Sequence, residues 1–163
     1  MSGGVQGYDP RTGEPVGDAV PETSDVSVDA VARAAEAAFP AWSSLPAAER
    51  ASVLDAVADA LDAASDGLVD LADAETALGR PRLTTELKRT TNQLRLFGDV
   101  LREGSYVEAT LDSANPDIIP PRPVLRRMLR PLGTVAVFAA SNFPFAFSVA
   151  GGDTASALAA GCP

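Results

Sequence analysis

The chain has 163 residues, of which 46% are hydrophobic, 6% aromatic and 21% charged, and its formal net charge is −9. This length suffices for one domain with a buried core, and the hydrophobic fraction is normal for a soluble globular protein. The negative charge argues against a nucleic-acid partner, because phosphate binding needs clustered Lys and Arg. The one basic cluster, expected to be the exposed face of a strand, consists of Arg122, Arg126, Arg127 and Arg130.

The chain contains no histidine and one cysteine, Cys162. A Ser-His-Asp triad, a His-ligated metal site and an internal disulfide therefore cannot be built from this chain alone, and no metal is expected. The most apolar stretch, residues 134–150, is interrupted by Ser141, Asn142 and Pro144 and is shorter than the roughly 20 apolar residues of a bilayer span. Because no secretory signal is visible at the N-terminus, the sequence predicts a cytoplasmic protein without membrane contact.

The first two thirds of the chain predict a turn followed by four helices. Residues 1–21 are rich in Gly and Pro, and Tyr8 to Gly13 is typical of a turn. The first helix is predicted over residues 27–39, and the second from Pro46 to a break at Asp66-Gly67. The third is predicted over residues 68–77, with Gly79 as its stop signal, and the fourth from Pro81 to Gly104. None carries a chemical motif, so all four are expected to be scaffold.

Capping residues and apolar spacing define these helices. Ser27 is the predicted N-cap of the first helix, and Pro40 is its predicted end. The residues that share one face are Val28, Val31, Ala35 and Ala38 in the first helix, Val53, Leu54, Val57 and Leu61 in the second, and Leu83, Leu87, Leu94, Phe97 and Leu101 in the fourth. Such spacing places one face of a helix against a core.

The character of the chain changes at Tyr106. Residues 106–111 are β-like, Asn115-Pro116-Asp117 is a turn signal, and Val124 to Arg130 is a possible second strand. These elements together predict a β-hairpin.

A strand, a turn and a helix are predicted for the last part. Pro131-Leu132-Gly133 turns the chain, and the apolar run Thr134–Ala140 is typical of a strand buried on both faces of a parallel sheet. Residues 141–144 lead into a helix of about residues 145–160, which Gly161 ends. A parallel sheet needs a second strand after such a helix, and the chain stops where that strand is expected. The sequence therefore predicts a truncated α/β protein.

The segment from Arg127 to Pro144 resembles the aldehyde dehydrogenase superfamily. Its members enter the cofactor domain through a Pro-x-Gly turn, a hydrophobic strand and an Asn-Phe-Pro turn, here Pro131-Leu132-Gly133, Thr134–Ala140 and Asn142-Phe143-Pro144. The run from Ser148 to Pro163 fits as well. The resemblance is therefore carried by more than thirty nearly consecutive residues.

One branch of the superfamily is most similar. Most members have Trp before the Asn, and this chain has Ser141, followed by Phe147 to Thr154. These features resemble the α-ketoglutaric semialdehyde (2,5-dioxopentanoate) dehydrogenases and some bacterial NADP-linked fatty aldehyde dehydrogenases. Residues 37–42 and Glu49-Arg50 extend the resemblance to the N-terminal helices, whereas Glu75 to Gly79 departs from the Glu-Thr-Gly more common in relatives.

The resemblance implies an α/β parent fold in three parts. Residues 1–105 form the helical part of the cofactor-binding domain, residues 106–130 an oligomerisation-type hairpin, and residues 131–163 the first, incomplete β–α unit of a Rossmann-like domain. The implied reaction is oxidation of an aldehyde to a carboxylate with NAD or NADP by a homo-oligomer. The first expected substrate is 2,5-dioxopentanoate, and a long-chain fatty aldehyde is the second.

The nucleophilic cysteine and the glutamate of the family lie downstream of Pro163, so this chain alone is predicted to be inactive. The alternative is a catalytically inactive fragment, or a non-enzymatic interaction partner of full-length subunits.

Asn142 is the predicted catalytic residue. The resemblance assigns its side-chain amide to the oxyanion that develops when a thiolate attacks the aldehyde, and an amide donates a hydrogen bond without titrating. The alternative from spacing alone is that Asn142 caps the following helix, since Asn is a favourable N-cap.

The resemblance also implies the neighbouring site residues. The nicotinamide half of the cofactor is expected along Phe138, Ala139, Ala140, Ser141 and Asn142, and the substrate tunnel along Phe143, Ala146 and Ala150. Cys162 follows a helix C-terminus and is expected to be structural. Gly151-Gly152 is expected inside a helix, where it serves close packing and not phosphate binding.

Overall fold

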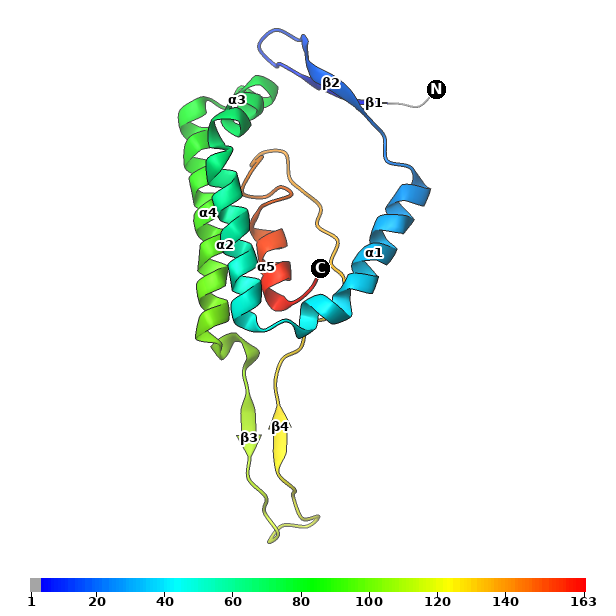
Figure 1. Ribbon diagram of the computed structural model, residues 1–163, viewed down its shortest axis with the longest axis vertical. Helices are drawn as coiled ribbons and strands as arrows, with labels where there is room; N and C mark the ends of the chain where they lie inside the picture. The colour runs from blue at the N-terminus through cyan, green and yellow to red at the C-terminus, as the bar shows by residue number, and fades with distance from the viewer. Residues whose placement is uncertain (1–3) are drawn as a thin grey trace.

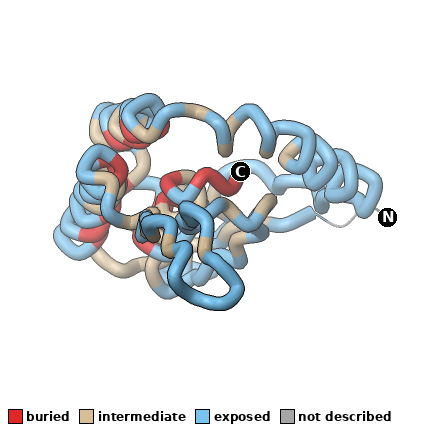
Figure 2. The backbone as a smooth tube through the Cα atoms, turned by 90° about the horizontal axis from the view of Figure 1, so that it is seen from below, coloured by how far each residue is buried: buried red, intermediate tan, exposed pale blue. Residues whose placement is uncertain are grey.

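Two long antiparallel helices, α2 (Ala47–Ala63) and α4 (Arg80–Glu103), form the centre of the computed structural model, which describes residues 4–163 (Figure 1). Helix α5 (Gly152–Ala160) packs against both, and α3 (Ser65–Thr76) packs against α4. Buried residues concentrate in these four helices, while much of the remaining chain is exposed (Figure 2). The main core cluster consists of Ala51, Leu54, Ala58, Leu94, Leu101, Ala155 and Ala159. Among residues 4–163, every helix is too short or too polar to cross a bilayer.

Ion pairs line the edge of the α2–α4 interface. Arg95 donates to Asp59 at 2.6 Å and to Asp62 at 2.8 Å, and Arg102 pairs with Asp55. The hydrogen bond from Arg95 holds the pKa of Asp62 below its usual value, against the opposing effect of burial. Inside this edge, Leu54 of the predicted α2 stripe meets Leu94 and Leu101 of the predicted α4 stripe in one buried cluster. Leu83 and Leu87 of the α4 stripe pack instead against α3 in a second cluster. Val53, predicted in the α2 stripe, is 40% exposed, which corrects the prediction.

Helix α1 (Asp25–Ser44) begins two residues earlier than predicted. Its N-cap is Ser24, whose hydroxyl accepts a hydrogen bond from the backbone N–H of Ser27 at 3.2 Å, so the predicted cap stands at the third helical position. The predicted apolar face is not buried, because Val28 and Val31 are 54% and 68% exposed. No described element covers this face.

Pro40 lies inside α1 and does not end it, contrary to the prediction. Proline removes its own N–H from the helical bonding, but the turn that follows is anchored from outside. The indole Nε1 of Trp42 donates to the carbonyl of Leu158 in α5 at 3.1 Å. Ser43 and Ser44 donate to carbonyls three residues earlier. A contact between residues far apart in the chain therefore extends the helix past its local stop signal.

The remaining helix boundaries follow the prediction in part. The break between α2 and α3 falls at Ala64, so Asp66-Gly67 lies within α3, because a glycine weakens a helix by about 1 kcal/mol without forbidding it. Helix α3 ends at the left-handed C-cap Ala77, whose N–H donates to the backbone carbonyl of Asp73. The carboxylate of Asp73 then accepts from the N–H of Gly79 at 2.8 Å. Helix α4 ends at Gly104, as predicted.

The N-terminal segment forms a hairpin of β1 (Gly4–Tyr8) and β2 (Pro15–Pro21), which the sequence did not predict. Its Gly and Pro content disfavours central strands, but an isolated two-stranded ribbon tolerates both residues. The predicted turn joins the strands. Arg11 in this turn pairs with Asp73 at 2.9 Å and so attaches the hairpin to α3.

The second hairpin is present where it was predicted, with shorter strands. Strands β3 (Thr110–Asp112) and β4 (Leu125–Arg127) pair antiparallel and project away from the helices (Figure 1). A 3-10 turn, η1 (Ser105–Val107), occupies the start of the first predicted strand. Of the predicted basic cluster, Arg126 and Arg127 lie in β4 and are exposed, but as neighbours in a strand they point to opposite faces. Arg130 is exposed and Arg122 is half-buried, and both lie outside the strand, so the four arginines do not form one strand face as predicted.

Residues 134–140, predicted as a buried strand, are extended but belong to neither sheet of the described chain. Phe138 is 91% exposed. One ladder-like hydrogen bond is present, from the N–H of Val135 to the carbonyl of Pro163 at 3.0 Å. A parallel strand is buried only where other strands and helices cover it, and the described residues supply little such cover.

Helix α5 is shorter than the predicted helix over residues 145–160. Residues 141–150 form successive turns, Gly151 is the N-cap and Gly152 is the first helical residue. The glycine pair therefore stands at a helix N-terminus and not inside a helix, which corrects the prediction. Its predicted role in close packing is present, because a Cβ on Gly151 would lie 2.7 Å from the carbonyl carbon of Ala146. The packing is against a turn and not against a sheet.

Candidate functional site

The turn of residues 141–150 carries most of the predicted site residues. It is closed on itself by two backbone hydrogen bonds, from Ala140 to Phe147 at 2.7 Å and from Phe147 to Phe143 at 3.2 Å. The rings of Phe143 and Phe147 also meet edge to face, with centroids 5.2 Å apart. The turn is therefore a compact unit and not an open loop.

One face of α4 supports this turn along its length. The residues that contact the turn are Arg82, Glu86, Arg89 and Gln93. They stand four, three and four positions apart, which is the spacing of residues on a single helix face. We call these four residues the α4 cradle.

The N-terminal half of the α4 cradle holds the start of the turn. The guanidinium of Arg82 donates to the backbone carbonyl of Asn142 at 2.8 Å and lies 5.3 Å from the ring centroid of Phe143. One helical turn later, Oε1 of Glu86 accepts from the N–H of Phe145 at 2.8 Å and from that of Ala146 at 2.9 Å. Helix α4 therefore holds the backbone at Asn142 and at the residues three and four positions after it.

The C-terminal half of the α4 cradle holds the end of the turn. Arg89 lies 5.6 Å from the ring centroid of Phe147. Gln93 packs against Gly152, where a Cβ would lie 3.0 Å from the Gln93 side chain. The cradle therefore spans the whole segment from Asn142 to the first residue of α5.

Sequence reasoning did not identify the α4 cradle. A signal for Glu86 was present, because this carboxylate stands between Leu83 and Leu87 on the predicted apolar stripe and is 5% exposed. A charged residue at a buried helical position is rare unless it is paired or hydrogen-bonded.

Asn142 itself is exposed at the tip of the turn. Within the described chain, the hydrogen bond that it makes is through its backbone carbonyl, and its side-chain amide has no partner. The helix-cap alternative is wrong, since α5 begins at Gly152 and its N-cap is Gly151. The side-chain amide of Asn142, a neutral hydrogen-bond donor, is therefore exposed at the surface of the turn.

The residues predicted along the cofactor lead into this turn, and Ser141 and Asn142 are its first two residues. Phe138, Ala139, Ala140 and Ser141 are all exposed. No titratable side chain stands among them. The cofactor contacts expected along this segment stay a prediction.

The three residues predicted along the substrate tunnel differ in exposure. Phe143 and Ala150 are half-buried and retain accessible surface. Ala146 is completely buried and packs beneath the turn. Its methyl group offers no surface to a substrate in this structure, because the N–H groups bound by Glu86 draw this part of the turn onto α4.

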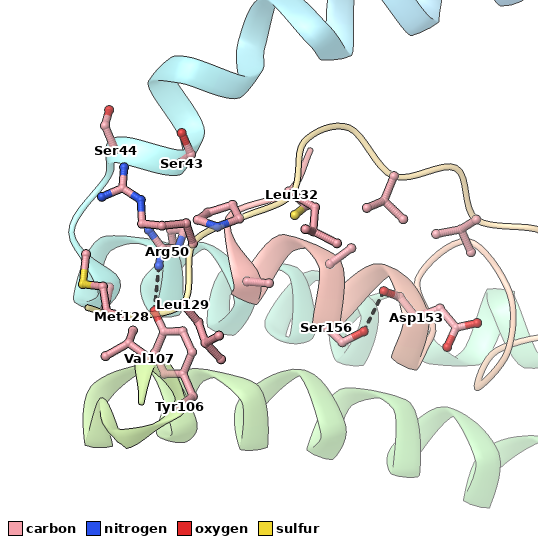
Figure 3. A pocket seen from close by; sticks show the side chains of 18 of the residues that line it. Ser43, Ser44, Arg50, Tyr106, Val107, Met128, Leu129, Leu132, Asp153 and Ser156 are labelled. Atoms are coloured by element: carbon pink, nitrogen blue, oxygen red, sulfur yellow. Dashed lines mark hydrogen bonds between the residues drawn. The ribbon is translucent and has the colours of Figure 1, made fainter. Parts of the chain in front are cut away.

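A cavity of about 1290 Å³ lies away from the turn, between the end of α1, α5 and residues 128–138. Arg50 and Tyr106 line it and are joined by a hydrogen bond, and on α5 the hydroxyl of Ser156 donates to the carbonyl of Asp153 (Figure 3). Of the predicted site residues, Phe138 alone contributes to its lining. The cavity therefore adds nothing to the chemistry predicted for Asn142.

Cys162 is 4% exposed, in keeping with the packing role expected for it. Within residues 4–163, no cluster of three or more His, Cys, Asp or Glu side chains is arranged to hold a metal ion. The groups with shifted pKa values stand elsewhere, on α2 and on the C-terminal half of α4: Asp62, Arg95, Arg102 and Glu103.

Comparison with known proteins identifies relatives over nearly the whole chain. The aldehyde dehydrogenase family profile matches residues 2–163. The chain is 48% identical, over 99% of its length, to alpha-ketoglutaric semialdehyde dehydrogenase 2 of Azospirillum brasilense. It is 46% identical, over 83% of its length, to alpha-ketoglutaric semialdehyde dehydrogenase of Acinetobacter baylyi. It spans 31% and 26% of the lengths of these two relatives.

The fold has relatives of known structure. The crystal structure of PnpE in complex with nicotinamide adenine dinucleotide matches with a TM-score of 0.80 and 27% identity, covering 98% of this chain and 31% of that one. The resemblance carried by residues 127–144 is thus confirmed, and the chain belongs to the aldehyde dehydrogenase family.

Proposed function

We propose that this chain forms the N-terminal part of an NAD(P)-dependent aldehyde dehydrogenase that converts an aldehyde to a carboxylate. The observation that carries the proposal is the 48% identity to an alpha-ketoglutaric semialdehyde dehydrogenase over 99% of the chain. In the overall reaction, the aldehyde and water give the carboxylate, and a hydride and two protons leave the substrate. The three-part division at residues 105 and 130 belongs to the same proposal.

Within this reaction the chain supplies the oxyanion donor. The side-chain amide of Asn142 donates to the carbonyl oxygen of the aldehyde as that oxygen gains negative charge. Because the amide does not titrate, its donation is independent of pH in the working range. Bound NAD or NADP supplies the hydride acceptor, and the exposed segment from Phe138 to Ser141 would flank its nicotinamide ring. The nucleophilic cysteine and the glutamate would come from residues outside 1–163.

We propose 2,5-dioxopentanoate, which is α-ketoglutaric semialdehyde, as the substrate. Both curated relatives described above carry this substrate in their names. Phe143 and Ala150 would line the path of the substrate, and the small side chain of Ala150 leaves room beside the ring. A long-chain fatty aldehyde is the competing substrate. The predicted cytoplasmic location and homo-oligomeric state stay predictions.

The test is a steady-state assay of the full-length protein with 2,5-dioxopentanoate and with decanal, each with NAD and with NADP. We expect kcat/KM for 2,5-dioxopentanoate to exceed that for decanal by about tenfold or more, a ratio that differential transition-state binding readily supplies. A higher kcat/KM for decanal would identify a long-chain aldehyde as the substrate, and aldehyde oxidation would remain the proposed reaction. Absence of cofactor reduction with either aldehyde would overturn the proposed function.

A further inference from the structure

Glu86 is a buried carboxylate without a basic partner in the part of the chain that the structure describes. It is 5% exposed, and its Oε2 has no hydrogen-bond partner there. The two arginines of the α4 cradle that flank it, Arg82 and Arg89, are directed at the rings of Phe143 and Phe147. A buried charge is costly unless hydrogen bonds or ion pairs compensate for it. The compensation at Glu86 therefore comes from the turn.

Both compensating bonds are made to consecutive backbone N–H groups. Oε1 accepts from Phe145 and Ala146 at 2.8 and 2.9 Å, and hydrogen bonds to an ionised acceptor are shorter and stronger than neutral ones. Two consecutive N–H groups directed at one oxygen fix the orientation of the intervening peptide. Glu86 therefore defines the backbone path of the turn and not merely its attachment to α4.

This backbone path determines where Asn142 stands. Phe145 lies three residues after Asn142, and Pro144 between them has a fixed φ. At Asn142 itself, the guanidinium of Arg82 donates to the backbone carbonyl at 2.8 Å. The backbone of Asn142 is therefore attached to α4 at its own carbonyl and again three and four residues later.

We propose that Glu86 is a positioning residue, whose Oε1 sets the place of the Asn142 amide through the N–H groups of Phe145 and Ala146. The inference rests on the proposed function, because it concerns the donor of that reaction. An oxyanion donor acts only at a narrow distance from the developing charge, and a misplacement of about 1 Å can cost about 10²-fold in rate. Glu86 itself touches neither the aldehyde nor the cofactor.

Two variants of similar size separate the acceptor from the charge. Glu86→Gln keeps a carbonyl oxygen for both N–H groups and removes the charge, whereas Glu86→Leu removes charge and acceptor together. In the full-length enzyme we expect Glu86→Leu to lower kcat per folded active site by about tenfold or more, with KM for the cofactor within about twofold of wild type. Glu86→Gln should recover most of that loss. The exposed carboxylate variant Asp99→Asn on α4 is the matched control and should be unchanged.

A double-mutant cycle with Asn142→Ala shows whether Glu86 acts through Asn142. In the Asn142→Ala background, Glu86→Leu should change kcat by no more than about twofold, because the side chain that Glu86 positions is already missing. A full additional loss in that background would overturn the inference. So would wild-type turnover in Glu86→Leu, or equal losses in the Gln and Leu variants.

Amide hydrogen exchange tests the same geometry without any activity. Glu86→Leu should accelerate exchange of the Phe145 and Ala146 N–H groups, and Glu86→Gln should leave them protected. If wild type reduced no cofactor but this exchange pattern held, the proposed function would fail while the control of the turn by Glu86 would stand. Unchanged exchange in Glu86→Leu would overturn the inference directly.

Discussion

Arg50 donates a hydrogen bond to the hydroxyl of Tyr106 at 2.9 Å and so joins the start of α2 to the segment that follows α4. The same guanidinium donates to the carbonyls of Leu45 at 2.6 Å and Ala159 at 3.3 Å. Arg50 is 6% exposed, so three separate parts of the chain depend on one buried cation. The Ala159 carbonyl lies in the last turn of α5, where the helix dipole favours positive charge.

We predict that Arg50→Met lowers the free energy of unfolding by about 3 kcal/mol or more, because it leaves buried acceptors without a donor. Tyr106→Phe removes one of the three bonds and should cost about 1 kcal/mol. Urea denaturation of both variants measures the difference. Equal stability of Arg50→Met and wild type would mean that these bonds contribute nothing net.

The ion pair between Arg95 and Asp62 predicts a dependence of stability on pH. Hydrogen bonding to Arg95 lowers the pKa of Asp62 in the folded state below its ordinary value of 3.8. The pair therefore stabilises the fold fully above that value and loses its contribution as the pH falls through the lower folded pKa. In a plot of the free energy of unfolding against pH, we expect Asp62→Asn to reduce the loss of stability at acid pH. We expect about 1 M salt to weaken the contribution of the ion pair in the wild-type protein. If the variant and the wild type lost the same free energy of unfolding at acid pH, this account would be contradicted.

Two glycines that differ only in backbone conformation give a matched stability test. Gly104 ends α4 with φ +88°, and Gly67 lies inside α3, while a Cβ at either position would meet no atom within 4 Å. Gly104→Ala should destabilise the protein by about 1–2 kcal/mol through the left-handed backbone. Gly67→Ala should stabilise it by up to about 1 kcal/mol through helix propensity. Thermal unfolding measures the melting temperature of both variants against the wild type. A shift of the same sign in both variants would contradict the backbone conformations assigned to the two glycines.

Residues 1–163 alone should not oxidise aldehydes, because the proposed nucleophile and glutamate come from residues outside them and Cys162 is buried. The purified chain would be incubated with 2,5-dioxopentanoate and each cofactor, alongside Cys162→Ala. We expect no sustained cofactor reduction by either protein. Turnover that is present in the wild-type chain and absent from Cys162→Ala would identify Cys162 as the nucleophile and reverse the assignment made here.

The sequence predicted those elements that local pattern determines. The leucine spacing of α4 and Gly104 after it located that helix within one or two residues, and the buried stripe is where the spacing placed it. The Pro-x-Gly and Asn-Phe-Pro turns led to the family, which the comparisons confirmed. In each case the residues that define the element are neighbours in the chain.

The failures arose where distant contacts decide the structure. Pro40 did not end α1, because the turn after it is anchored to Leu158 in α5. Helix α5 did not begin at residue 145, where the N–H groups are bound by Glu86 instead. The burial of Glu86 had a signal in the sequence, but its contact with the turn did not, since nothing in local spacing indicates that a carboxylate on α4 meets a turn about 60 residues later.

The most direct test of the central claim is Asn142→Ala in the full-length enzyme, with kcat measured per folded active site and cofactor affinity measured separately. A donor used only as charge develops contributes to the transition state and little to ground-state binding. We predict a fall in kcat of about 10²-fold or more, with cofactor affinity and melting temperature close to wild type. Turnover per folded site within a few-fold of wild type would contradict the account, and the catalytic role of Asn142 would be withdrawn.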